Sequence, residues 1–155
     1  MPQTPIRILF VCHGNICRST MAEFVLKDMV ARRGLAERFH IESAATSTEE
    51  IGNPVHPGTA AVLREYGIGG FEGKRARQLR RADYDAFDFI IGMDTANIRN
   101  MNWILGGDPD GKVFKLLEFA GTSRSVDDPW YTGDFETTYA DVCDGCEGLL
   151  AYLGV

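Results

Sequence analysis

The feature that most restricts the fold is the start of the chain, where a β-rich apolar run meets a tight loop and then a helical pattern. Ile6–Cys12 has the composition of a buried strand. Gly14 and Asn15 interrupt that run. Residues 19–33 then place apolar side chains at helical spacing, and Gly34 follows as a stop signal. The chain is therefore predicted to open with a strand, a short loop and a helix.

The rest of the sequence continues this alternation. Further strands are predicted at residues 39–45, 87–92 and 112–116. Helices are predicted at residues 57–66, from a cap at Asp94 to about residue 105, and at 135–153, with a loop at 126–133. Because strands alternate with helices, we expect one α/β domain over residues 1–155, with a mostly parallel sheet covered by helices on both faces. Ligands of such sheets bind beyond the carboxyl ends of the strands, and Cys12 stands at one such end.

Charge and composition exclude several classes of function. The net charge of −6 gives an acidic average surface, which argues against nucleic acid as a partner but allows a locally positive pocket. No segment approaches the roughly 18 apolar residues of a membrane span. Residues 1–7 lack the basic start of a secretory signal. We therefore expect a cytoplasmic protein without a membrane partner.

The predicted first loop has the residues of an anion site, in the order Cys12-His13-Gly14-Asn15-Ile16-Cys17-Arg18-Ser19. Backbone N–H groups of such a loop can surround one tetrahedral oxyanion, and the helix that follows adds its positive end. Gly14 is expected to supply backbone freedom, and Arg18 a planar fork for two phosphate oxygens. The N–H groups, the positive helix end and the guanidinium together favour the thiolate form of Cys12. The Ser19 hydroxyl could donate a hydrogen bond to that thiolate. The loop thus predicts a nucleophile beneath a bound phosphate.

A second segment can supply the general acid that an ester leaving group needs. Asp127 and Asp128 precede Pro129, which restricts Asp128 toward extended conformations. Trp130 and Tyr131 offer flat walls beside a pocket. Either carboxyl could protonate the leaving oxygen, since chemistry alone does not choose between two adjacent acids.

Residues 10–19, followed by Met21-Ala22-Glu23, closely resemble the phosphate-binding loop of low-molecular-weight protein tyrosine phosphatases. Residues 42–47, 51–54, 87–94 and 128–131 resemble further segments of that family, in the same order, and Thr132 is similar to its bacterial members. The resemblance covers essentially the whole chain. It implies a flavodoxin-like, doubly wound fold with a four-stranded parallel sheet. It also implies hydrolysis of phosphotyrosine and aryl phosphate esters through a cysteinyl-phosphate, without metal or other cofactor.

The same resemblance implies roles for individual residues. Cys12 would be the nucleophile, Arg18 the phosphate clamp, and Asp128, rather than Asp127, the general acid. The residues implied in substrate binding are His13, Gly14, Asn15, Ile16, Cys17, Ser19, Glu49, Trp130 and Tyr131. The residues implied in a supporting hydrogen-bond network are Asn15, Ser19 and Ser43, with Asp94 near the base of the loop.

Three further features of the resemblance bear on regulation and specificity. Cys17 corresponds to a second loop cysteine that would form a reversible disulfide with Cys12 under peroxide, or would simply be a small buried side chain. His13 and the acidic pair Glu49 and Glu50 depart from the family pattern at the pocket mouth. Two carboxylates there would disfavour acidic phosphopeptides.

The implied partners are a phosphotyrosine protein or a small aryl phosphate, with phosphate as product inhibitor and a monomer as the default state.

Other interpretations fit the sequence less well. A thioredoxin-coupled arsenate reductase shares the loop but needs two more cysteines in the middle of the chain, and residues 79–94 contain none. Cys143 and Cys146 have the spacing of a zinc or redox pair, but no second ligand pair accompanies them, so we expect them to pack in the core. A phosphate-binding module without catalysis would be expected to lack the nucleophile or the acid.

Overall fold

A four-stranded sheet organises the computed structural model, which describes residues 4–155. Its strands are β1 (Ile6–Cys12), β2 (Phe39–Ala45), β3 (Phe89–Gly92) and β4 (Val113–Lys115). They lie in the order β2-β1-β3-β4, and every pair is parallel. The flavodoxin-like sheet expected from the sequence is thus confirmed. Residues 1–3, which form part of the segment 1–7 considered above as a possible signal, lie outside the described residues.

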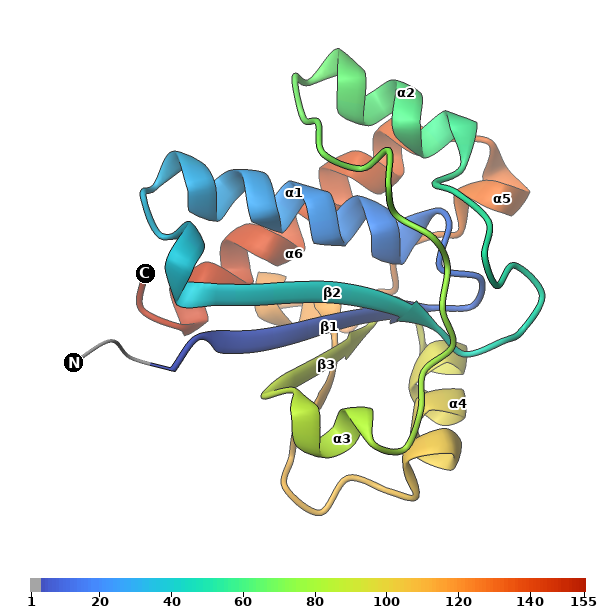
Figure 1. Cartoon of the computed structure of the whole chain (residues 1–155), viewed down its shortest axis with the longest axis vertical. Coiled ribbons are helices and arrows are strands. Elements are labelled where there is room, and N and C mark those ends of the chain that lie inside the picture. The colour runs from blue at the N-terminus through green and yellow to red at the C-terminus, as the bar shows by residue number, and fades with distance from the viewer. Residues whose placement is uncertain (1–3) are drawn as a thin grey trace.

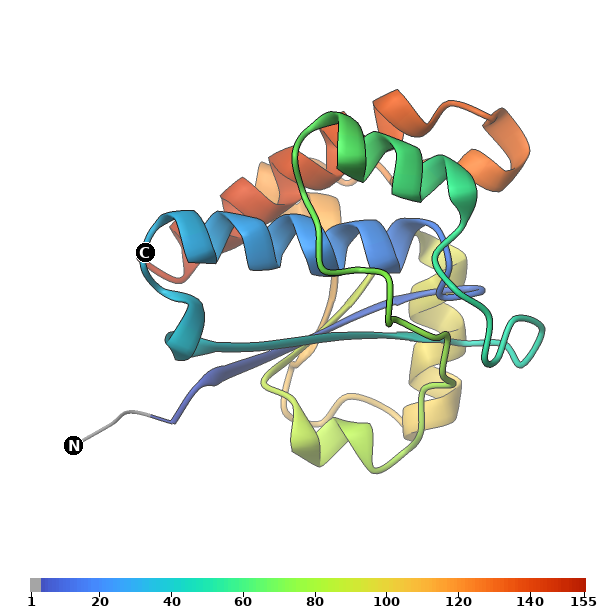
Figure 2. The same cartoon turned by 45° about the horizontal axis from the view of Figure 1, so that its top comes forward.

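Helices cover both faces of this sheet (Figures 1 and 2). The helices α1 (Arg18–Arg32), α2 (Pro57–Glu65) and α6 (Phe135–Tyr152) lie on one side. The helices α3 (Asp83–Ala86) and α4 (Thr95–Leu105) lie on the other. In this strand order the chain turns in opposite directions from β1, which leaves a crevice at the carboxyl ends of β1 and β3.

The central strand β1 shows why this sequence needs two helical layers. Ile8 and Phe10 point into the core shared with α1 and α6, whereas Leu9 and Val11 belong to the core beneath α4. All four side chains are fully buried. A strand buried on both faces is continuously apolar rather than alternating, as this one is.

The predicted cap of α4 is present. The Asp94 carboxylate accepts a hydrogen bond from Asn97 N at 2.7 Å, and the Asn97 side chain accepts one from Asp94 N at 3.3 Å. This capping box closes the first turn of α4 and holds Asp94 beside the end of β3.

Several element boundaries differ from the sequence-based expectations. The strand predicted from residue 87 begins at Phe89, because α3 ends just before Phe87 and the Asp88 carboxylate accepts a hydrogen bond from Arg7 N. The strand predicted to residue 116 ends at Lys115, where the 3-10 helix η2 (Leu116–Ala120) begins. The loop predicted at 126–133 contains the single helical turn α5 (Pro129–Thr132).

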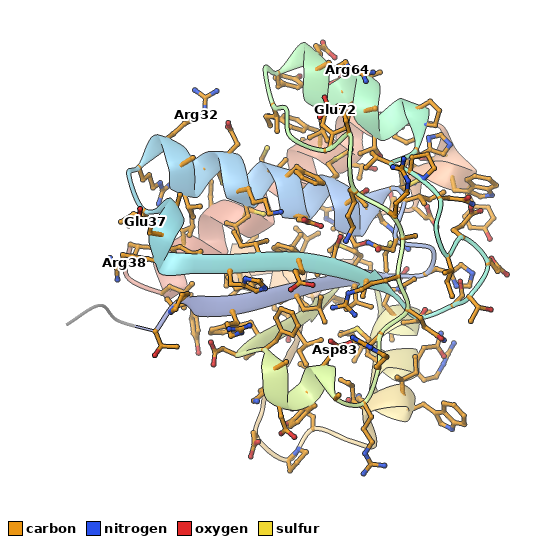
Figure 3. All side chains as sticks on the ribbon, viewed as in Figure 1. Arg32, Glu37, Arg38, Arg64, Glu72 and Asp83 are labelled. Atoms are coloured by element: carbon orange, nitrogen blue, oxygen red, sulfur yellow. The ribbon has the colours of Figure 1, made fainter. Side chains whose placement is uncertain are left out.

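Charged side chains project from the outer surfaces of the helical layers. Figure 3 shows Arg32 on α1 and Arg64 on α2, both pointing away from the sheet. Glu37 and Arg38 lie in the 3-10 turn η1 (Ala36–Arg38), at the amino end of β2 (Figure 3). Because β1 and β2 are parallel, with Ile6 opposite Phe39, this turn lies at the end of the sheet opposite to Cys12. Among the described residues, no helix combines the length and apolarity needed to cross a membrane.

Candidate active site

The loop between β1 and α1 lies at the carboxyl end of the central strand, as the sequence predicts. Its unusual backbone conformation occurs at Asn15, with φ 58°, and not at Gly14, where we expected it. Asn15 tolerates this conformation because its side chain is held by neighbours. Gly14 instead leaves space for the Glu50 side chain, because a Cβ at this position would lie only 3.3 Å from Glu50 Cγ.

Cys12 ends β1 and is only 3% exposed. Its Sγ accepts a hydrogen bond from Asn15 N at 3.3 Å and lies 3.1 Å from Ser19 Oγ. The sulfur atom thus lies close to the start of α1, in contact with a backbone N–H group and a hydroxyl group.

Arg18 is 2% exposed and is oriented by the end of β3 and the segment after η2. Its Nη1 donates to Asp94 Oδ2 at 2.7 Å and to Val126 O at 2.9 Å. Since Nη1 carries only two hydrogens, these contacts leave the Nε and Nη2 hydrogens as a fork for an oxyanion. Burial acts to lower the pKa of Arg18, but the negative charges of Cys12, Asp94 and Asp128 outweigh it, so the pKa is raised.

Asp128 lies above this loop and caps α5. Its backbone is extended, with φ −81° and ψ 113°, as the following proline predicts. One carboxylate oxygen accepts a hydrogen bond from Trp130 N at 3.0 Å, and the other lies 3.5 Å from Arg18 Nη2. Asp128 lines the pocket, whereas the neighbouring Asp127 is exposed outside it.

The segment that carries Asp128 is anchored on both sides. Before it, Val126 N donates to Met93 O at 2.9 Å, and Val126 itself is 1% exposed. Beside it, Thr138 Oγ1 on α6 donates to Asp127 O at 3.4 Å. These contacts join the segment to the end of β3 and to α6.

A cavity of about 360 Å³ joins the two segments. The residues that line it are Cys12, His13, Gly14, Ile16, Cys17, Arg18, Glu49, Glu50, Asp128, Trp130 and Tyr131. At its mouth His13 Nε2 lies 2.8 Å from Glu49 Oε2, and both side chains are exposed. Glu50 was not among the residues expected to bind substrate, although it follows Glu49 directly in the sequence.

Asn15 and Ser19, which were expected to bind substrate, do not line this cavity. They lie behind the loop, where Asn15 Nδ2 donates to Ser19 Oγ and to Ser43 Oγ, both at 2.8 Å. The network expected from the sequence is thus present as a set of contacts. It also includes Glu23, which accepts a hydrogen bond from Ser43. In the sequence, only its position a few residues after the loop pointed to this residue.

The other cysteines differ from Cys12 in their surroundings. Burial, followed by the negative charges of Cys12 and Asp128, raises the pKa of Cys17 to about 12. Cys17 therefore stays a thiol near neutral pH, and its pairing with Cys12 remains a prediction. Cys146 is buried in the core and Cys143 packs against that core, as expected. Within residues 4–155, no three metal-binding side chains are grouped as a metal ion would need.

These features together define a class of protein. A cysteine and an arginine in an anion-binding loop, at the crevice of a flavodoxin-like sheet and facing a carboxyl group, form the site of a cysteine-based phosphatase. The chain belongs to the low molecular weight phosphotyrosine protein phosphatase family, whose sequence model matches residues 7–154.

Curated relatives and solved structures agree with this assignment. The low molecular weight protein-tyrosine-phosphatase YfkJ of Bacillus subtilis is 43% identical over 148 residues, 94% of each chain. Its crystal structure matches with a TM-score of 0.93 over 98% of this chain and 96% of that chain. The phosphatase SP-PTP of Streptococcus pyogenes, 43% identical, matches with a TM-score of 0.86 over 96% and 93% of the two chains. The alternative of a thioredoxin-coupled arsenate reductase is not favoured by relatives that bear phosphatase names.

Proposed function

We propose that this chain is a protein tyrosine phosphatase that hydrolyses phosphotyrosine and other aryl phosphate monoesters as a single catalytic domain. The observation that carries the proposal is the position of Cys12 Sγ at the base of the cavity, between the donors of the loop and the Asp128 carboxyl. Below it the loop offers inward N–H groups and Arg18. Above it, the aromatic side chains of Trp130 and Tyr131 line the cavity and offer flat surfaces on which an aryl ring can pack.

In the first step Cys12 acts as nucleophile. Its thiolate attacks the phosphorus atom, so an S–P bond forms while the ester P–O bond breaks. The Nε hydrogen of Arg18 and the Nη2 hydrogen that does not face Asp128 bind two equatorial oxygens, where charge accumulates in the transition state. The Asp128 carboxyl gives its proton to the leaving phenolate oxygen, and the phenol departs.

In the second step Asp128 acts as base. Its carboxylate takes a proton from a water molecule while the water oxygen attacks phosphorus. The S–P bond breaks, inorganic phosphate forms, and the Cys12 thiolate and the Asp128 carboxyl return to their starting states. Because phosphate then occupies the same loop, we expect it to inhibit as product. Apart from the attacking water, each group named in these steps is a side chain or backbone group of this chain.

The role of Asp128 can be tested against its neighbour. Asp128→Asn is expected to lower kcat for para-nitrophenyl phosphate about 10²-fold or more, and to lower it further for phenyl phosphate, whose leaving group needs the proton more. Asp127→Asn is the matched control, because that side chain is exposed and does not line the cavity. Equal losses in both variants, or no dependence on the leaving group, would remove Asp128 from the role of acid.

The charges at the cavity mouth are expected to bias the choice of peptide. Glu49 and Glu50 line the cavity, so phosphotyrosine flanked by lysine is expected to react with a higher kcat/KM than phosphotyrosine flanked by glutamate. Exposed charge pairs contribute about 0.2–1 kcal/mol, which predicts a ratio of about 1.4- to fivefold that high salt reduces. The double variant Glu49→Gln, Glu50→Gln is expected to bring the ratio toward one. Glu37→Gln, at the far end of the sheet, is the control.

We further propose that the enzyme is a cytoplasmic monomer whose substrates are phosphotyrosine proteins or small aryl phosphates. The acidic net charge of −6 supports the absence of a nucleic-acid partner. Light scattering of the purified chain tests whether it is a monomer, and competition by inorganic phosphate in the hydrolysis assay tests the expected product inhibition.

A further inference from the structure

We infer that His56 is a positioning residue for Trp130, because the histidine ring holds the indole ring in place as a wall of the cavity. The inference rests on the proposed function, in which Trp130 packs against the aryl ring of the substrate. His56 itself does not line the cavity. It lies directly before α2, and the amino end of α2 is next to α5 in both views (Figures 1 and 2).

Trp130 needs support from outside its own element. It lines the cavity, yet it is 59% exposed, and it lies in α5, a helical turn of only four residues. An exposed side chain changes its rotamer within nanoseconds unless a neighbour restrains it. A mobile ring is a weak wall for an aryl group, because ordering that ring on binding costs free energy.

The ring of His56 supplies this restraint. Its centroid lies 5.7 Å from the Trp130 ring, with 78° between the two planes, and 5.1 Å from the Phe135 ring, with 20° between the planes. The first contact is edge-to-face and the second is stacked, and both are favourable arrangements of aromatic rings. His56 thus connects the exposed indole ring to an aromatic ring at the start of α6.

His56 is itself held by two hydrogen bonds. Its backbone N donates to Ile16 O at 2.9 Å, which ties it to the loop between β1 and α1. Its Nδ1 accepts from Gly58 N at 2.9 Å and so caps α2. The first bond fixes the backbone and the second fixes the direction of the ring, so the imidazole is a rigid support for Trp130.

Phe135 completes the support from the other side. A Cβ at Gly58 would lie only 2.4 Å from Phe135 Cζ, so the phenyl ring lies directly against the first turn of α2. Phe135 also packs against Ile16 and Cys17 of the loop. A continuous set of contacts therefore runs from the loop through Phe135 and His56 to Trp130, and it sets the distance between the indole ring and the phosphate site.

The cap and the ring of His56 can be separated by substitution. Asparagine is a preferred cap, because its side-chain oxygen can accept from Gly58 N, but it has no aromatic ring. Phenylalanine has an aromatic ring and no acceptor. We therefore expect His56→Asn to keep the cap and lose the support of Trp130. His56→Phe is expected to lower the Tm by a few degrees and to keep that support.

The first measurement compares two unreactive phosphate analogues as competitive inhibitors of para-nitrophenyl phosphate hydrolysis. In His56→Asn, the Ki of benzylphosphonate is expected to rise about three- to tenfold, whereas the Ki of methylphosphonate, which has no aryl group, is expected to stay the same. KM for para-nitrophenyl phosphate is expected to rise with kcat within about twofold, because no reacting group is changed. His56→Phe is expected to restore both Ki values to those of the wild type.

His40 provides the matched control. Its ring also lies beside an aromatic ring, that of Phe87 at 6.0 Å, but it is near the amino end of β2 and does not line the cavity. His40→Asn is therefore expected to leave the ratio of the two Ki values unchanged.

The second measurement follows Trp130 directly and does not depend on activity. In Trp103→Phe, Trp130 is the one remaining tryptophan, and the replaced side chain is 86% exposed. In this background His56→Asn is expected to add a nanosecond loss of fluorescence anisotropy, which reports rotation of the indole ring. His56→Phe is expected to add none.

Unchanged anisotropy in His56→Asn, or an unchanged ratio of the two Ki values, would overturn the inference. Equal losses in His56→Asn and His56→Phe would also overturn it, because the ring would then have no role. If His56→Asn does not fold, His56→Ser replaces it as a second cap without a ring. Failure of the proposed function is distinguishable: the wild type would then not hydrolyse para-nitrophenyl phosphate, while the anisotropy would still test the contact between His56 and Trp130.

Discussion

Cys12→Ser is expected to reduce hydrolysis of para-nitrophenyl phosphate by about 10⁴-fold or more, to the level of the assay background. A serine hydroxyl in this position keeps the shape of the side chain but is a far poorer nucleophile near neutral pH than a thiolate. The two groups that contact the sulfur atom, Asn15 N and the Ser19 hydroxyl, remain in place. Steady-state kinetics with added chelator measure the loss without interference from contaminating metal-dependent phosphatases.

The variant also separates binding from catalysis. Because the loop and Arg18 are unchanged, Cys12→Ser is expected to bind inorganic phosphate with an affinity within a few-fold of the wild type, as calorimetry can measure. Cys146→Ser is the control for loss of a buried thiol, since Cys146 lies in the core away from the cavity. Retained turnover in Cys12→Ser would return thioredoxin-coupled arsenate reduction, and then simple phosphate binding, to consideration.

The second large effect is expected from Arg18→Lys, which keeps the charge and removes the fork. The guanidinium donates hydrogen bonds to Asp94 and Val126 O, and it is expected to bind the phosphate oxygens at the same time. A single ammonium group cannot reach all of these acceptors. Because the lost contacts strengthen in the transition state, kcat is expected to fall about 10³-fold. The same measurement on phosphate affinity is expected to show a smaller loss.

A matched arginine provides the control for Arg18→Lys. Arg124 donates from both terminal nitrogens to Asp141 but does not line the cavity. Arg124→Lys is therefore expected to leave kcat within a few-fold of the wild type. A fall in kcat with Arg18→Lys no larger than that of Arg124→Lys would show that a single positive charge, and not the planar fork, is what the loop requires.

The elements around the loop were predictable from the sequence because their signals are local. The apolar run of β1, the cap at Asp94 and the extended backbone at Asp128 each depend on residues within a few positions. The resemblance of the whole chain to one family added the choice of Asp128 over Asp127, which local chemistry left open. The structure places Asp128, and not Asp127, at the cavity.

What the sequence did not show depends on contacts between distant segments. The single turn α3 has no periodicity to detect, and the start of β3 is set partly by a hydrogen bond between Arg7 and Asp88. The left-handed backbone at Asn15 is held by Ser19 and Ser43, so a glycine seemed the better candidate from local rules.

The contacts that anchor the segment around Asp128 also affect the motions of the enzyme. Val126 is bonded to Met93 at the end of β3, and Asp127 to Thr138 on α6, so the acid already faces the cavity before any substrate arrives. If Asp128 is the acid, we expect that no lid has to close over the ester or open afterwards. Turnover is then expected to be limited by the making and breaking of the S–P bond rather than by a slow conformational gate.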